Sequence, residues 1–193
     1  DTPTSSFQIS SNCRFGRIPN FLTPEERDKV EQSVDNLDKC WLNRSTCHPR
    51  VPFWTLGAVT YLEGCDNIKQ YHRHRKALNP ILRKRFSWLY DIFEMKMSKE
   101  LGDLVVCDDN LALPGFHIFG PKKGVTMNRQ ECFYLEQPLA SIHTDIQYKE
   151  HMSHWSQYKE VDLSQVLSFT LTIQLPTHGG GLYIWDWANF DQE

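Results

Sequence analysis

A change in hydrophobic period near Gly102 constrains the fold of this 193-residue chain more than any other feature. Before Gly102 the apolar residues recur at three- and four-residue intervals, as in amphipathic helices. After it they gather in short runs bounded by proline, glycine, aspartate or asparagine, as strands do. Helices followed by strands, without βαβ alternation, predict an α+β domain in which helices buttress an antiparallel sheet or barrel. We expect this single domain over residues 15–193, after a loose N-terminal segment at residues 1–14.

Two helical regions precede Gly102. Thr23-Pro24-Glu25-Glu26 has the residues of a capping box, which predicts a helix whose apolar stripe continues to about Trp41. A second helical pattern runs from Asp66 to Leu101. We expect Pro80 to divide it, because proline lacks the backbone N–H and disfavours a helical residue before it. The piece after the proline is predicted to end at Gly102 and to pack through one apolar face, which consists of Leu82, Phe86, Leu89, Phe93 and Met97.

Several strands are expected after the helices. The clearest is Leu167 to Leu175, where apolar and polar residues alternate over nine positions. One side of such a strand packs, and the other meets water or a cavity. The remaining predicted strands are Leu104 to Cys107, Phe116 to Phe119, Ala140 to Tyr148 and Leu182 to Trp187.

His143 and Asp145 form the motif with the most specific chemistry. On a strand they project to one side, while Ile142 and Ile146 project to the other. An imidazole and a carboxylate held two residues apart supply two of the three protein ligands of the facial triad that binds non-haem Fe(II). Spacing alone leaves a second interpretation open, a hydrogen-bonded His–Asp pair without metal.

The order of four features resembles the Fe(II)- and 2-oxoglutarate-dependent oxygenases of the double-stranded β-helix (jelly-roll) class. These features are the helix that begins at Thr23, the motif His143-x-Asp145, the alternating strand Leu167 to Leu175, and the glycine turn Gly179 to Gly181 that enters another strand. The resemblance implies a double-stranded β-helix (jelly roll) buttressed by N-terminal helices. It also implies that Fe(II), 2-oxoglutarate as cosubstrate and O2 take part, with His143 and Asp145 as metal ligands and catalytic residues. The implied reaction is decarboxylation of 2-oxoglutarate to succinate and CO2, coupled to hydroxylation of a substrate.

The family's remaining site residues have no counterpart in this sequence. A distal histidine, and then an arginine or lysine that pairs with the 2-oxoglutarate carboxylate, follow the glycine turn by several strands in that family. The 193 residues contain neither position, and His178 lies too close to the preceding strand to replace the histidine. We therefore expect the domain as given to lack its last core strands; a misleading resemblance and a fold without activity are the alternatives.

Further site residues are expected around the motif. His117 and Thr172 are assigned to cosubstrate binding, and Gln147 and Trp185 to substrate binding. Gln147 shares its side of the strand with the two expected metal ligands, and the polar side of the alternating strand carries Thr172. Each residue also has a structural interpretation, as a hydrogen-bonded histidine, a solvated sheet face or a packed aromatic ring.

Charge and cysteine content limit which partners the protein could bind and in which cellular compartment it is expected. A net charge of −3 provides no global attraction to nucleic acid or to an anionic membrane, and no run of about 18 apolar residues occurs. The basic stretch Tyr71 to Lys76 is interpreted as a solvated helix face, because His72 and His74 lie about 200° apart around a helix and do not converge on one ion. The six scattered cysteines favour reduced thiols in a cytoplasmic protein.

The sequence thus predicts an oxygenase that hydroxylates a small molecule, such as an amino acid or similar metabolite, or a protein side chain. A small-molecule substrate is expected rather than nucleic acid, and the oligomeric state stays open. The alternatives are a non-catalytic jelly-roll binding or interaction protein, in which His143 and Asp145 only hydrogen-bond, and a cupin-like metalloenzyme without 2-oxoglutarate.

Overall fold

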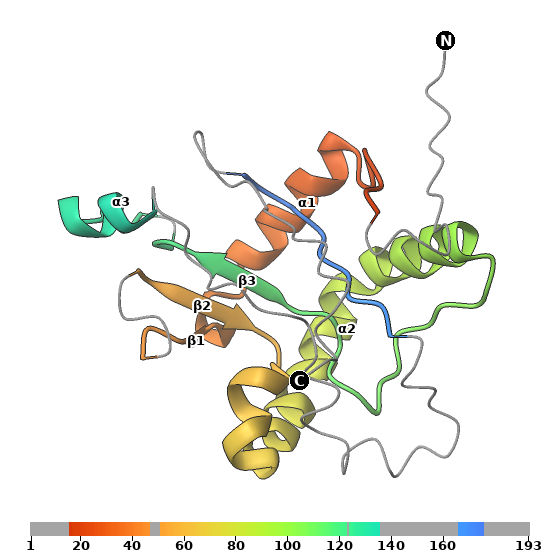
Figure 1. Cartoon of the computed structure of the whole chain (residues 1–193), viewed down its shortest axis with the longest axis horizontal. Helices are drawn as coiled ribbons and strands as arrows, with labels where there is room; N and C mark the ends of the chain where they lie inside the picture. The colour runs from red at the N-terminus through yellow and green to blue at the C-terminus, as the bar shows by residue number, and fades with distance from the viewer. Residues whose placement is uncertain (1–15, 47–50, 123, 136–165, 176–193) are drawn as a thin grey trace, which may run out of the picture.

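The computed structural model describes residues 16–46, 51–122, 124–135 and 166–175 (Figure 1). Its regular elements are helices, helical turns and three short strands, and the longest helix lies between the second and the third strand in the chain. They are α1 (Pro24–Asp35), the 3-10 turn η1 (Asp38–Cys40), β1 (Leu42–Asn43), β2 (Phe53–Leu56), the π-helical turn η2 (Thr60–Gly64), α2 (Cys65–Leu101), β3 (Phe116–Phe119) and α3 (Arg129–Leu135).

The three strands form an antiparallel sheet in the order β1-β2-β3. One face of the sheet packs on the hydrophobic core that α2 supplies, and Phe86 of α2 meets Phe116 of β3 with 4.6 Å between ring centroids. The other face carries Thr55 opposite His117. This face also carries Phe53 and Phe119, whose rings stack with 4.5 Å between centroids, so it is partly polar and partly aromatic.

Helix α1 begins where the sequence predicts. The N–H of Glu26 donates to Thr23 Oγ1 at 3.2 Å, and the N–H of Thr23 donates to Glu26 Oε2 at 2.8 Å, so the capping box is confirmed. The helix ends at Asp35 rather than near Trp41, which corrects the predicted length. Asn36 ends it, because its side chain donates to Gln32 O at 2.8 Å and competes with the helical backbone for that carbonyl.

Replacing Thr23 with alanine is expected to lower the free energy of unfolding by about 1 kcal/mol, since the N–H of Glu26 loses its acceptor. Urea denaturation followed by circular dichroism measures the loss. A Thr23→Ser variant keeps the hydroxyl and should unfold within a few tenths of a kcal/mol of the unaltered protein. Equal loss in both variants would show that the cap does not stabilise α1.

Helix α2 corrects the prediction of a break at Pro80, since it runs unbroken from Cys65 to Leu101. Pro80 and Lys76 are both exposed, so the carbonyl that loses its intrahelical donor lies on the solvent side of α2, where water can bond it. Buried Leu78 and Leu82 flank the proline and anchor the helix on both sides of it. Packing therefore outweighs a helix-propensity cost of about 3 kcal/mol.

The apolar face and the end of α2 match the sequence prediction. Leu82, Phe86, Leu89 and Met97 are buried and Phe93 is half-buried against the same core. The helix stops before Gly102, which has a positive φ of 71° and donates its N–H to Ser98 O at 2.9 Å. None of the helices in the described ranges is both long and apolar enough to cross a bilayer.

The strand predictions fare less well. Phe116–Phe119 is a strand as predicted, whereas Leu104 to Cys107 is not, because side chains bond its backbone instead of a neighbouring strand. Val105 N–H donates to Ser98 Oγ at 2.9 Å, and Cys107 N–H donates to Glu94 Oε1 at 2.8 Å. Residues 166–175 are likewise not assigned as a strand, although Leu171 and Ile173 pack on the core and so keep the alternation.

Two predicted strands, Ala140 to Tyr148 and Leu182 to Trp187, lie outside the described residues. Strand β2 was not predicted, because Phe53-Trp54-Thr55-Leu56 lacks a polar–apolar alternation; both of its faces are buried or half-buried. The part of the chain that the structure describes holds helices and an open antiparallel sheet, and the double-stranded β-helix stays a prediction.

Candidate functional site

Two of the six predicted site residues fall within the described residues, namely His117 and Thr172. His117 lies on β3, and Thr172 is exposed in the extended segment 166–175. The other four, for which the structure gives no position, are His143, Asp145, Gln147 and Trp185.

His117 projects from the sheet face opposite α2. Its register partner on β2 is Thr55, and its ring meets Phe53 edge-on at 5.7 Å between centroids. Although His117 as a whole is exposed, desolvation of its ring and the positive charge of Arg44 lower the pKa of the imidazole below its ordinary value of 6.5. At neutral pH the ring is therefore uncharged, with one donor and one acceptor nitrogen.

Beside His117 lies a buried polar cluster formed by Arg44, Thr55, Glu63 and His74, which we call the Glu63 cluster. Arg44 Nε donates to Thr55 Oγ1 at 2.9 Å, and Arg44 Nη2 pairs with Glu63 Oε1. His74 Nδ1 lies 2.8 Å from the same carboxylate oxygen. Thr55 and the Glu63 side chain are 0% exposed, so water does not reach these two members of the cluster.

The second oxygen of Glu63, Oε2, is buried and has no hydrogen-bond partner within the described residues. A buried carboxylate with one unpartnered oxygen is costly, because desolvation is not repaid by a hydrogen bond. The cluster therefore depends on the bonds that Arg44 and His74 make to Oε1.

Four elements assemble the cluster, and sequence reasoning missed it. Arg44 directly follows β1, Thr55 belongs to β2, Glu63 to the π turn η2, and His74 to α2. Single-turn π segments are frequent at functional sites. One sequence signal was available, because Glu63 is the single charged residue in the run from Val51 to Gly64. A lone charge in an apolar run is typical of a buried, paired side chain.

The interpretation of Tyr71 to Lys76 as a solvated face is wrong for part of the stretch. Tyr71 is only 2% exposed, and its hydroxyl accepts from Ala112 N–H at 3.0 Å. His74 turns toward Glu63. The two residues face inward because α2 covers both η2 and the segment that leads to β3.

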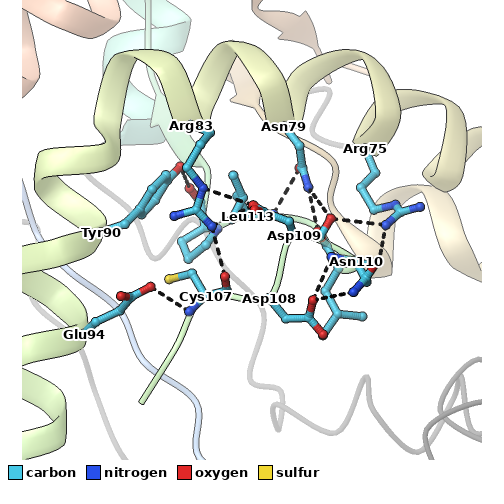
Figure 2. Close-up of polar contacts among 12 residues, drawn as sticks. Arg75, Asn79, Arg83, Tyr90, Glu94, Cys107, Asp108, Asp109, Asn110 and Leu113 are labelled. Carbon is cyan, nitrogen blue, oxygen red and sulfur yellow. Dashed lines mark hydrogen bonds and ion pairs between the residues drawn. The ribbon is translucent and has the colours of Figure 1, made fainter. Parts of the chain in front are cut away.

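A row of polar side chains on α2 holds the segment Cys107 to Pro114, which leads into β3 (Figure 2). The amide of Asn79 acts as both donor and acceptor. Its Nδ2 donates to Leu111 O at 2.7 Å, and its Oδ1 accepts from Leu113 N–H at 3.1 Å. Arg83 Nη2 reaches Asp109 Oδ1 at 2.6 Å and Cys107 O at 3.0 Å. These bonds fix the path of the chain and so the place of His117.

Two further bonds complete this attachment. Tyr90 Oη donates to Pro114 O at 2.8 Å, and Glu94 accepts from the Cys107 N–H. Burial, with the nearby Glu94 carboxylate, raises the pKa of the Cys107 thiol to about 11. The thiol is protonated at neutral pH and is not a nucleophile, so this region is a structural support rather than a reactive site.

Within the described ranges, no group of three or more histidine, cysteine, aspartate or glutamate side chains could hold a metal ion. The expected ligands His143 and Asp145 lie outside those ranges. Comparison of the chain with protein-family models, with curated proteins and with solved structures gives no match.

Proposed function

We propose that the protein is an Fe(II)- and 2-oxoglutarate-dependent oxygenase that hydroxylates a small molecule or a protein side chain. The observation that carries the proposal is the pair His143-x-Asp145 in an alternating strand pattern, which supplies nitrogen and oxygen donors suited to Fe(II). Further support comes from the way in which α2 and the three-stranded sheet pack on each other. An amphipathic helix packs on one face of an antiparallel sheet, and the other face carries Thr55 and His117 beside the stacked rings of Phe53 and Phe119.

Each site residue has a role under this proposal. His143 and Asp145 hold the metal, which when bound supplies O2 activation and the oxidation of 2-oxoglutarate to succinate. Neutral His117 and the hydroxyl of Thr172 hydrogen-bond the cosubstrate, while Gln147 and Trp185 orient the substrate. The protein acts in the cytoplasm, in keeping with the free thiols of the described cysteines Cys40, Cys107 and Cys132.

The test measures succinate formed by the full-length protein with Fe(II), 2-oxoglutarate and O2. An Asp145→Ala variant is expected to lose at least about 100-fold in succinate formation and in metal affinity, since it removes an anionic ligand. Asp91→Ala is the matched control, because Asp91 is an exposed carboxylate on α2, and it should keep both properties.

Metal content separates the alternatives. Mn(II) in place of Fe(II), followed by electron paramagnetic resonance, reports binding without turnover. Full turnover in Asp145→Ala contradicts the proposal. Absence of metal binding would favour the non-catalytic jelly-roll protein, and metal binding without dependence on 2-oxoglutarate would favour the cupin-like enzyme.

A further inference from the structure

We infer that one face of α2 docks a short acidic segment of a protein partner. This face carries four exposed cations, which we call the α2 basic stripe, and they are Lys69, Arg73, Lys76 and Lys84. The inference rests on the charge and exposure of described residues, and it holds whether or not the protein binds Fe(II).

The part of α2 that carries the stripe is strongly basic, although the whole chain is acidic. Residues 68–90 contain seven lysine and arginine residues and no aspartate or glutamate. The other 170 residues hold the remaining 14 basic and all 24 acidic side chains, which gives them a net charge of −10. The net charge of −3 therefore conceals a local excess of positive charge, and such an excess attracts an anionic partner.

Helical spacing aligns the four cations. Successive residues of an α-helix turn by about 100° and rise by about 1.5 Å. The members of the stripe therefore fall within an arc of about 80° around α2 and span about 22 Å along its axis. They form a narrow linear row rather than a broad patch.

No member of the stripe has a counter-charge in the described part of the chain. The cations of the ion pairs found there are Arg44, His74, Arg83 and Lys122. Like charges three or four positions apart on a helix repel one another, as Lys69, Arg73 and Lys76 do here. An acidic partner offsets this repulsion and adds attraction of its own, so the stripe is suited to carboxylates from another molecule.

The length of the stripe and its neighbours favour an acidic peptide over other polyanions. An extended peptide of six or seven residues also covers about 22 Å. The exposed residues between the cations are Gln70, Ala77 and Pro80, which offer no aromatic ring for nucleic-acid bases and no large apolar side chain for a bilayer. A longer polyanion would extend over the rest of the protein, whose net charge of −10 repels it.

Fluorescence anisotropy with a labelled peptide of six glutamates tests the inference on the unaltered full-length protein. A peptide of six glutamines is the ligand control. The glutamate peptide is expected to bind, and the glutamine peptide is not. Raising NaCl from about 20 mM to about 200 mM should weaken binding at least about 5-fold, because salt screens interactions between exposed charges.

A double variant, Arg73→Gln with Lys76→Gln, should weaken binding of the glutamate peptide about 5-fold or more. The matched control is Arg85→Gln with Lys99→Gln. It removes the same charge from exposed positions of the same helix that lie outside the stripe, and its affinity should stay within about 2-fold of the unaltered protein. Glutamine has a helix propensity close to that of lysine and arginine, and circular dichroism checks that both variants keep their helices.

Absence of peptide binding at low salt overturns the inference, and this measurement needs no variant. Equal weakening in the two double variants overturns it as well, because net charge and not the stripe would then determine affinity. Two further probes are single-stranded DNA of seven nucleotides and vesicles that contain phosphatidylserine. Stronger binding of either probe than of the peptide would assign the stripe to nucleic acid or to a membrane and would contradict the inference.

Discussion

Replacement of Phe86 by alanine is expected to lower the free energy of unfolding by about 3–5 kcal/mol. Phe86 is 0% exposed and joins α2 to β3, because its ring centroid lies 4.6 Å from that of Phe116. Truncation removes the apolar area of the ring and leaves a cavity that the helix and sheet cannot fill, since Leu82 and Met97 on the same face are held by the rest of the core. Urea denaturation monitored by tryptophan fluorescence measures the change.

The matched control is Phe133→Ala on α3. Phe133 is 57% exposed and contacts Tyr134, so its loss should change the free energy of unfolding by no more than about 0.5 kcal/mol. If the two variants were equally stable, α2 and the sheet would not share one core around Phe86 and Phe116.

Replacement of Glu63 by alanine is expected to cost about 3–5 kcal/mol, because it leaves the guanidinium of Arg44 buried without its counter-charge. His74 also loses its partner. Glu63→Gln keeps the shape and one acceptor oxygen, so it should cost less than the alanine variant. Chemical denaturation of the variants, compared at one pH, gives the order of stability.

A double variant tests the cause of this loss. Arg44→Met combined with Glu63→Leu removes both charges and fills the space, so it should recover much of the stability that Glu63→Ala loses. Asp38→Ala is the surface control. Asp38 forms an ion pair with Lys122, and its side chain is 73% exposed. Breaking this exposed pair should lower the free energy of unfolding by no more than about 1 kcal/mol. A loss in Asp38→Ala as large as that in Glu63→Ala would show that burial is not the cause.

Local features were predictable from the sequence. The capping box at Thr23, the apolar face of α2 and the glycine stop at Gly102 depend on residues within a few positions of each other, so their spacing alone determines the structure. β3 was predictable for the same reason, as a short apolar run between a glycine on each side.

Features that depend on distant residues were not predictable. The continuity of α2 at Pro80 depends on core packing on both sides of the proline, and Leu104 to Cys107 fails to form a strand because side chains of α2 occupy its backbone donors. In the Glu63 cluster, Arg44 and Glu63 are separated by 19 positions. A periodic sequence pattern does not reveal a contact between residues so far apart. Glu63, the lone charged residue in an apolar run, indicated a buried side chain but not which residues would pair with it.

The segment Leu113 to Gly115, which leads directly into β3, determines which side of the sheet His117 occupies. Asn79 holds Leu113, Tyr90 holds Pro114, and a Cβ on Gly115 would lie 2.2 Å from Leu56 O, so the backbone has no slack before the strand begins. Adding one residue at this point would shift the pairing by one rung and turn His117 toward α2. An insertion between Leu113 and Gly115 is therefore expected to change the register of β3, and with it the position of His117.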